Sequence, residues 1–166
     1  MYSNKTNIPN AWIYIAIDIR DLSICKVGLT TTENPKNRIS QGNTSNPFYI
    51  LFNCYNLSEI GISKEELTDF ERYLHKKLGP RIRIVASGEK SEWIETSPFC
   101  AEDQIEHFIS NAFSLKGQSF QDEDGSVKTD TMNSIKYAHR PCHLHIHERI
   151  NYCKYKEYLD FLISLS

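Results

Sequence analysis

Four side chains in the first half of the chain combine the groups that hydrolysis of a phosphodiester bond requires. They are Tyr14, Lys26, Arg38 and Glu71. Such a reaction needs a base that activates water, positive charge beside the phosphoryl oxygens, and a divalent cation on a hard oxygen ligand. Whether these groups serve one site depends on the strands and helices that carry them.

Two strands are predicted to carry the tyrosine and the lysine. Residues 11–19 alternate between isoleucines and other side chains, which is the period of a strand with one apolar face. Residues 23–29 alternate in the same way, and the short connection allows a hairpin. A hairpin centred on Arg20 would oppose Tyr14 and Lys26 on the face without the isoleucines, whereas a one-residue slip would separate them.

The arginine is predicted to lie on a short helix. The pair Asn34-Pro35 is typical of a helix start, and this helix ends near Gly42 with Arg38 on its second turn. The polar residues 41–46 follow. Their side chains suit phosphate contacts, but they are equally common in ordinary loops.

A later helix is predicted to hold Glu71 against the protein core. A capping box at residues 63–66 opens this helix, and Gly79-Pro80 ends it. Its apolar stripe consists of Leu67, Phe70, Leu74 and Leu78. On a helical wheel, at about 100° per residue, Glu71 falls beside this stripe, with His75 one turn later. A carboxylate in this position needs a metal or a charged partner, and a salt bridge to a neighbouring Lys or Arg is the commoner arrangement.

The remaining elements complete an α+β domain. Residues 48–55 are predicted to form a third strand, 81–85 and 91–95 a short hairpin turning at Gly88, and 101–115 a helix. We therefore expect a small, mainly antiparallel three-stranded sheet flanked by helices. The expected organisation is an N-terminal tail (1–10), this domain (11–115), a linker or disordered loop (116–130) and a His-rich C-terminal appendage with a terminal helix (131–166).

Composition and charge restrict the class of protein without deciding its function. The formal net charge of −2 counts against a nucleic-acid-binding protein. However, residues 72–90 are mostly basic and residues 92–106 mostly acidic, so one face could meet phosphates; an ordinary solvated surface is the alternative. No apolar run approaches a membrane span, residues 1–10 lack a signal-peptide core, and the five scattered cysteines do not suggest a disulfide framework. We therefore expect a cytoplasmic protein.

The order of these motifs resembles the GIY-YIG nuclease superfamily, over about residues 11–96. The motifs are Trp12-Ile13-Tyr14, Lys26-Val27-Gly28, Arg38 and Glu71. The chain is similar to a phage and bacterial branch in which the second motif reads Lys-Ile-Gly. Features shared with that branch are Thr30, Pro47-Phe48, the pair Glu71 and His75, and Glu92-Trp93. Trp12 stands where the general pattern has its first Gly, and Lys26 where it has the second Tyr, so Tyr14 alone is left for the role of base.

The resemblance implies roles for individual residues. Glu71 would hold one Mg²⁺ or Mn²⁺, Arg38 would stabilise the scissile phosphate, and Tyr14 would accept a proton from water or orient it. Lys26 would lower the pKa of Tyr14 from its ordinary value of about 10, and His75 could relay a proton. The candidate nucleic-acid contacts are Gly28, Thr30, Gln41, Asn43, Lys76, Lys77, Arg81 and Arg83. Structural alternatives exist for Tyr14 as part of the sheet face, for Lys26 as a solvated side chain and for His75 as support for Glu71. Glu92-Trp93 is interpreted as packing.

A second cluster lies in the C-terminal part of the chain. It consists of His139, Cys142, His143, His145, His147 and Cys153. A strand would project three of the histidines from one face, so a zinc site is conceivable, but no Cys-x-x-Cys or His-x-x-x-His spacing is present. An exposed strand with titrating histidines is the commoner arrangement, and a pH-tunable nucleic-acid surface is a third interpretation.

We expect a metal-dependent endonuclease that hydrolyses phosphodiester bonds by a single-metal mechanism, with DNA preferred over RNA. The alternatives are a non-catalytic nucleic-acid-binding module of the same fold and an RNA-directed nuclease. A protein-partner role has only the amphipathic C-terminal helix in its support. A homodimer would suit double-strand cleavage, and no membrane partner is expected.

Overall fold

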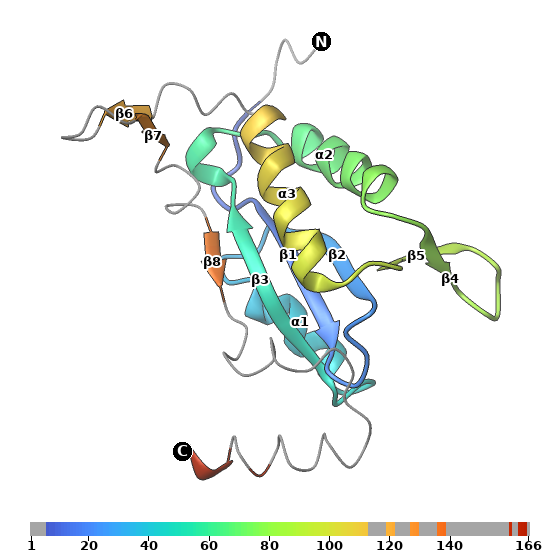
Figure 1. Ribbon diagram of the computed structural model, residues 1–166. Coiled ribbons are helices and arrows are strands. Elements are labelled where there is room, and N and C mark those ends of the chain that lie inside the picture. The colour runs from blue at the N-terminus through green and yellow to red at the C-terminus, as the bar shows by residue number, and fades with distance from the viewer. Residues whose placement is uncertain are drawn as a thin grey trace.

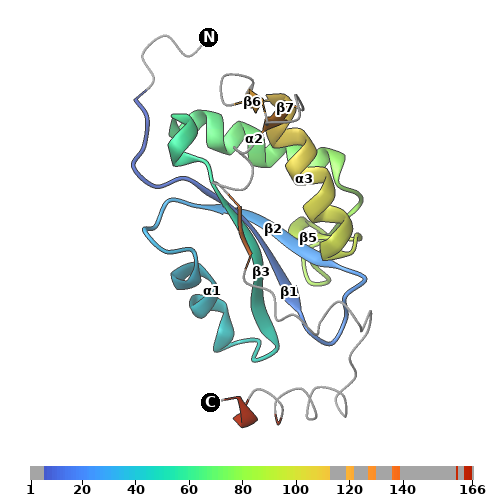
Figure 2. The ribbon, with the colours of Figure 1, turned by 60° about the vertical axis from the view of Figure 1, so that its left-hand side comes forward.

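The structure, a computed structural model, describes residues 6–112, the segments 119–121, 127–129, 136–138 and 163–165, and residue 160. It has an α+β fold in which one antiparallel sheet carries helices on both faces (Figures 1 and 2). The strands of this sheet are β1 (Trp12–Asp18), β2 (Cys25–Thr30), β3 (Tyr49–Asn56), β4 (Arg81–Arg83), β5 (Lys90–Ile94) and β8 (Lys136–Ala138). The helices are α1 (Lys36–Asn43), α2 (Lys64–Lys77), α3 (Pro98–Ala112) and the 3-10 turn η1 (Ser58–Ile60).

The α+β class is confirmed, but the prediction of a three-stranded sheet was wrong. The strand order is β4-β5-β2-β1-β3-β8, so residues 6–112 contribute five strands and β8 pairs with the outer edge of β3. The predicted hairpin of β4 and β5 exists, with Gly88 at a positive φ of 73° in its turn. Its second strand joins β2 through the pairs Cys25–Ile94 and Lys26–Trp93. Sequence periodicity does not report this pairing, because it joins segments far apart in the chain.

The register of the β1–β2 hairpin also differs from the prediction. Tyr14 lies opposite Gly28, and Lys26 lies opposite Ala16, so the tyrosine and the lysine are not cross-strand partners. The shift amounts to two residues, which leaves each side chain on its predicted face. Tyr14 and Lys26 therefore stay on one face of the sheet but are not directly opposed.

A longer connection than predicted explains the shift. Strand β1 ends at Asp18, whose carboxylate accepts hydrogen bonds from the backbone N–H and the guanidinium of Arg20 at 2.9 Å. Asp21 then accepts the backbone N–H of Ser23 at 3.0 Å, and Leu22 is buried in the core. These local bonds and the buried leucine stabilise a loop that moves the centre of the hairpin one residue along the chain.

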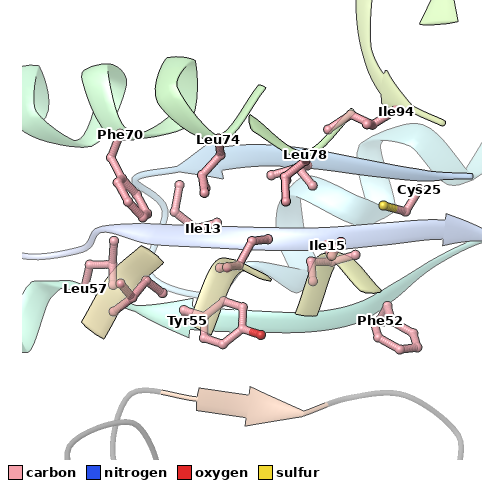
Figure 3. Close-up of a cluster of buried hydrophobic side chains, with 14 of the residues drawn as sticks. Ile13, Ile15, Cys25, Phe52, Tyr55, Leu57, Phe70, Leu74, Leu78 and Ile94 are labelled. Atoms are coloured by element: carbon pink, nitrogen blue, oxygen red, sulfur yellow. The ribbon is translucent and has the colours of Figure 1, made fainter. Parts of the chain in front are cut away.

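The two faces of the sheet have different covers. The isoleucines of β1 pack beneath α2 and α3, as Figure 3 shows for Ile13 and Ile15 against Leu74 and Leu78. The opposite face carries Tyr14 and is covered by α1 (Figure 2). Full burial of a leucine or isoleucine contributes about 1.5–3 kcal/mol, so the first face, which carries the larger buried cluster, contributes more to the stability of the fold.

Local signals in the sequence explain where α2 begins and how it packs. The Ser63 hydroxyl accepts the backbone N–H of Glu66, and the Glu66 carboxylate accepts the backbone N–H of Ser63, so the predicted capping box is confirmed. The predicted apolar stripe of α2 is buried in the core. Gly79, at a φ of 145°, ends the helix in a conformation that favours glycine.

The predicted boundaries after residue 112 stay predictions. Strands β6 (Ser119–Gln121) and β7 (Val127–Thr129) pair within the stretch proposed as a linker, and β8 lies in the proposed appendage. The His/Cys cluster that was considered for zinc, residues 139–153, lies outside the described residues. Within the described part of the chain, no helix is long and apolar enough to cross a membrane.

Candidate active site

The hydroxyl of Tyr14 lies directly over the backbone of Gly28. A Cβ atom at Gly28 would come within 2.6 Å of the tyrosine Oη and 2.7 Å of its Cζ, which is closer than real Cβ contacts. The two residues are cross-strand neighbours, so the ring crosses from β1 onto the bare backbone of β2. A side chain at position 28 would therefore displace the Tyr14 ring, and the bare backbone of Gly28 leaves room for the phenol.

Glu92 and Lys26 lie beside this phenol. The same Cβ position at Gly28 is 3.1 Å from Oε2 of Glu92, and Nζ of Lys26 is 3.6 Å from that oxygen. The lysine ammonium also lies 5.4 Å from the centre of the Tyr49 ring. Glu92 and Arg38, rather than Lys26, are therefore the charged groups that act on Tyr14 most strongly, and the interpretation of Glu92 as a packing residue did not include this contact.

Glu71 and His75 reach the site from α2 by binding the edge of β2. The ladder between β2 and β5 ends at Lys26, which leaves the outward-facing backbone groups of the next residues without a strand partner. Glu71 Oε2 accepts the N–H of Leu29 at 2.7 Å, and His75 Nε2 lies 2.6 Å from the carbonyl oxygen of Val27, to which it donates. Both side chains therefore complete the sheet edge and are held in place by it.

Burial and neighbouring charges raise the pKa of Tyr14 to about 12. Desolvation is the largest cause, and the carboxylates of Glu92 and Glu71 add to it. Arg38 acts in the opposite direction, both as a hydrogen-bond partner and through its charge. The phenol is therefore protonated in the isolated protein, and additional positive charge is needed before it can accept a proton.

The pKa of Glu71 is raised by burial, and the nearby Glu92 carboxylate raises it further. The charge of His75 and the hydrogen bond from the Leu29 N–H lower it, but they do not cancel the effect of burial. Two carboxylates that repel each other favour a proton or a cation between them.

Arg38 closes the site from the α1 side. The Arg38 side chain is exposed, and its Nη1 donates to Oε1 of Gln41 at 3.0 Å. Helix α1 lies so close to the sheet at Gly42 that a Cβ atom there would be only 2.9 Å from the Tyr49 ring. Burial and the neighbouring Tyr14 raise the pKa of Tyr49, and the Trp93 ring lies 6.1 Å from the Tyr49 ring.

The remaining candidate contacts divide into four groups. Thr30 is buried, with its hydroxyl 3.0 Å from that of Thr32, so it does not face a ligand. The structure does not describe the side chain of Asn43. Lys77 is turned away, 5.8 Å above the Tyr73 ring. Lys76, Arg81 and Arg83 gather in a separate groove beside His75.

The carboxylates of the candidate site are the described side chains to consider for a single hard divalent cation. Among residues 6–112 and the described short segments, no group of three or more His, Cys, Asp or Glu side chains could hold a metal ion. Mg²⁺ is commonly bound by one or two carboxylates with waters and substrate phosphate oxygens. Glu71, whose pKa the neighbouring Glu92 carboxylate raises, is the candidate oxygen ligand for such an ion.

The pairing of β5 explains why the sequence did not predict that Glu92 lies beside Gly28. Strand alternation would place Glu92 with Ile94, which is buried in the core beneath α2 and α3. The ladder stops at Trp93, however, and Glu92 reaches toward Gly28 beyond it. The signal in the sequence that could have identified Glu92 was the pair Glu92-Trp93, which this chain shares with the nuclease branch.

Comparison with protein-family models, with curated proteins and with solved structures finds no match to this chain. The candidate site is therefore defined by the geometry of these residues and by the resemblance of their order and spacing to the GIY-YIG pattern.

Proposed function

We propose that this protein is a metal-dependent endonuclease of the GIY-YIG type that hydrolyses phosphodiester bonds, with duplex DNA as its preferred substrate. The observation that carries the proposal is the convergence of Tyr14, Glu92, Lys26 and Glu71 around the bare backbone of Gly28. With Arg38, which acts on Tyr14 as a hydrogen-bond partner, two carboxylates, two cations and a phenol gather here, which is more than the stability of the fold requires.

In this proposal Arg38 and Lys26 bind the non-bridging oxygens of the scissile phosphate. Both cations border the phenol, Arg38 through its contact with Tyr14 and Lys26 through Glu92. The charge that develops on the phosphoryl oxygens in the transition state is stabilised by such preorganised donors. Tyr14 positions the attacking water and accepts its proton.

Glu71, with Glu92 beside it, would hold the Mg²⁺ or Mn²⁺ ion. When bound, the ion would act as a Lewis acid on the phosphoryl oxygen and lower the pKa of coordinated water. At neutral pH a phenol with a pKa of about 12 has about one molecule in 10⁵ ionised, so Tyr14 needs the cations of the site to act as a base. His75 acts through Glu71 and β2 as a positioning residue, because its Nε2 is engaged by Val27.

The test is incubation of supercoiled plasmid with Mg²⁺, with Mn²⁺ and with EDTA, for the unaltered protein and for Glu71→Gln. Nicking or linearisation that depends on the cation and is lost in the variant supports the proposal. Cleavage that persists in Glu71→Gln would refute it. Parallel digests of single-stranded DNA, duplex DNA and RNA identify the substrate.

A non-catalytic nucleic-acid-binding module is the second candidate, and one observation favours it. The pKa of Tyr14 is far above neutrality, which suits a structural phenol better than a base. Salt-sensitive DNA binding without cleavage under any cation would support this candidate over the enzyme. Cleavage of RNA alone would favour the RNA-directed nuclease.

A further inference from the structure

A basic groove lies between the C-terminal half of α2 and the hairpin formed by β4 and β5. Its volume is about 480 Å³, and no carboxylate belongs to its lining. The positively charged or titratable residues that line it are Arg72, His75, Lys76, Arg81, Arg83 and Lys90. In a chain with a formal net charge of −2, five lysine and arginine side chains in one groove form a local concentration of positive charge.

Two of these arginines are held in place by the hairpin itself. Arg81 Nε donates to the carbonyl of Ser91 at 2.7 Å, and Arg83 Nη1 donates to the carbonyl of Gly88 at 2.7 Å. Carbonyl oxygens do not neutralise the guanidinium charge, so these bonds orient the cations and leave their charge available. The groove is therefore a preorganised surface for anions.

The tip of the same hairpin exposes apolar side chains. Val85 is fully exposed at 102% and Ile84 is 46% exposed, although both belong to a well-formed turn. Backbone hydrogen bonds from Ile84 N to Glu89 O, at 2.8 Å, and from Gly88 N to Ile84 O, at 2.7 Å, hold this turn. The loop extends away from the helices (Figure 1). An apolar tip next to fixed cations suits a β-ribbon in the major groove of DNA, where apolar side chains contact the methyl group of thymine and cations contact the phosphates.

We propose that the β4–β5 hairpin enters a groove of duplex DNA while the basic groove binds the backbone phosphates beside it. This inference rests on the proposed function, from which it takes duplex DNA as the substrate. His75 lines the basic groove and lies one turn of α2 after Glu71, so the phosphate track begins beside the candidate active site. A two-stranded β-ribbon fits the major groove of B-form DNA, whereas the deep, narrow major groove of A-form RNA excludes protein side chains.

The test measures DNA binding in EDTA, where no cation-dependent cleavage occurs. Anisotropy of a labelled DNA duplex is followed over a series of KCl concentrations for Lys76→Glu and for the matched control Lys77→Glu. The two variants change the net charge equally and differ by one position, but Lys77 does not line the groove and lies over the Tyr73 ring. Lys76→Glu is expected to weaken binding about tenfold or more and to reduce the salt slope by about one, while the control stays within about twofold.

A second variant tests the apolar tip separately. Val85→Ser removes an exposed side chain and leaves the fold intact, because Val85 makes no contribution to the core. It is expected to weaken duplex binding about three- to tenfold with an unchanged salt slope, since it removes no charge. Labelled RNA duplexes of the same sequence are expected to show no loss from this substitution.

Equal effects of Lys76→Glu and Lys77→Glu would overturn the phosphate track, because the charge alone would then account for binding. An unaltered affinity in Val85→Ser, or the same loss on RNA, would overturn the insertion of the hairpin into DNA. The inference and the proposed function fail in different ways. If Glu71→Gln loses cleavage but Lys76→Glu and Val85→Ser bind DNA normally, only the inference is refuted. If these two variants lose DNA binding but the unaltered protein cleaves no DNA, only the proposed endonuclease function is refuted.

Discussion

Replacing Glu71 by Gln or by Ala separates the two tasks assigned to this carboxylate. One is structural, because Oε2 accepts the Leu29 N–H at 2.7 Å on the edge of β2. The other is the proposed binding of a divalent cation. A glutamine oxygen can accept the same hydrogen bond but binds cations poorly, whereas an alanine performs neither task.

The expected stabilities follow from burial and from the direction of the pKa shift. The pKa of Glu71 is higher in the folded protein than its ordinary 4.5, so its stabilising contribution is present below that pH and is lost as the pH rises through the folded value. Glu71→Gln is therefore expected to be at least as stable as the unaltered protein at neutral pH in EDTA. Glu71→Ala leaves the Leu29 N–H without its partner, which costs about 1–3 kcal/mol.

Thermal unfolding measures these differences directly. For a chain of this size a loss of 1 kcal/mol lowers the Tm by about 2–4 °C, so Glu71→Ala should unfold about 2–12 °C lower. A cation at about 100 times its Kd stabilises a folded protein by about 2.7 kcal/mol, so Mg²⁺ or Mn²⁺ should raise the Tm of the unaltered protein but not that of Glu71→Gln. Glu65→Gln, an exposed glutamate on the same helix, is the matched control and should respond to the cation as the unaltered protein does.

Two results would refute this reasoning. If the cation raises the Tm of Glu71→Gln as much as that of the control, the ion does not bind at Glu71. If Glu71→Gln is as unstable as Glu71→Ala, the negative charge rather than the acceptor oxygen completes the β2 edge.

Four further substitutions test the neighbouring residues. Gly28→Ala should cost about 1–3 kcal/mol by urea unfolding, because its methyl group would overlap Tyr14, and Tyr14→Ala should relieve that cost in the double variant; a neutral Gly28→Ala contradicts the geometry. Tyr14→Phe should lower single-turnover cleavage by about 10²–10⁴ at unchanged DNA affinity, and in the unaltered protein the logarithm of the rate should rise with pH throughout the neutral and mildly alkaline range, since the pKa of Tyr14 is about 12; a flat profile excludes the phenol as base. Glu92→Gln should lower the pKa of Tyr14, as read from its ¹³Cζ NMR shift; an unchanged value would place Glu92 away from the phenol. Lys26→Met should change the stability by less than about 1 kcal/mol, because its pair with Glu92 is partly exposed, while cleavage falls; equal cleavage removes Lys26 from the site.

The sequence predicted the faces of the strands and the course of the helices well. Alternation in β1 placed the isoleucines in the core and Tyr14 on the other face, and the structure confirms both. The capping box at Ser63 and the half-buried position of Glu71 were also predicted from the sequence. These features depend on the periods of the strand and the helix, which neighbouring residues along the chain set by themselves.

The contacts between elements far apart in the chain could not be predicted from these local periods. Tyr14 was predicted to face Lys26, but the buried Leu22 and the hydrogen bonds of Asp18 lengthen the turn and place it opposite Gly28. The tertiary structure alone brings Glu92 to the site, because β5 pairs with β2 only as far as Lys26.

The sequence by itself indicated Tyr14, Lys26, Arg38 and Glu71 as candidate groups, and it indicated the face of the strand on which Tyr14 lies and the face of the helix on which Glu71 lies. The tertiary structure decided which of them touch. Strand register and the pairing of β5 with β2 depend on turn geometry and on the packing of the whole core, and no local period records either of them. The phenol of Tyr14 consequently lies against Gly28 beside a carboxylate, where the sequence predicted a lysine.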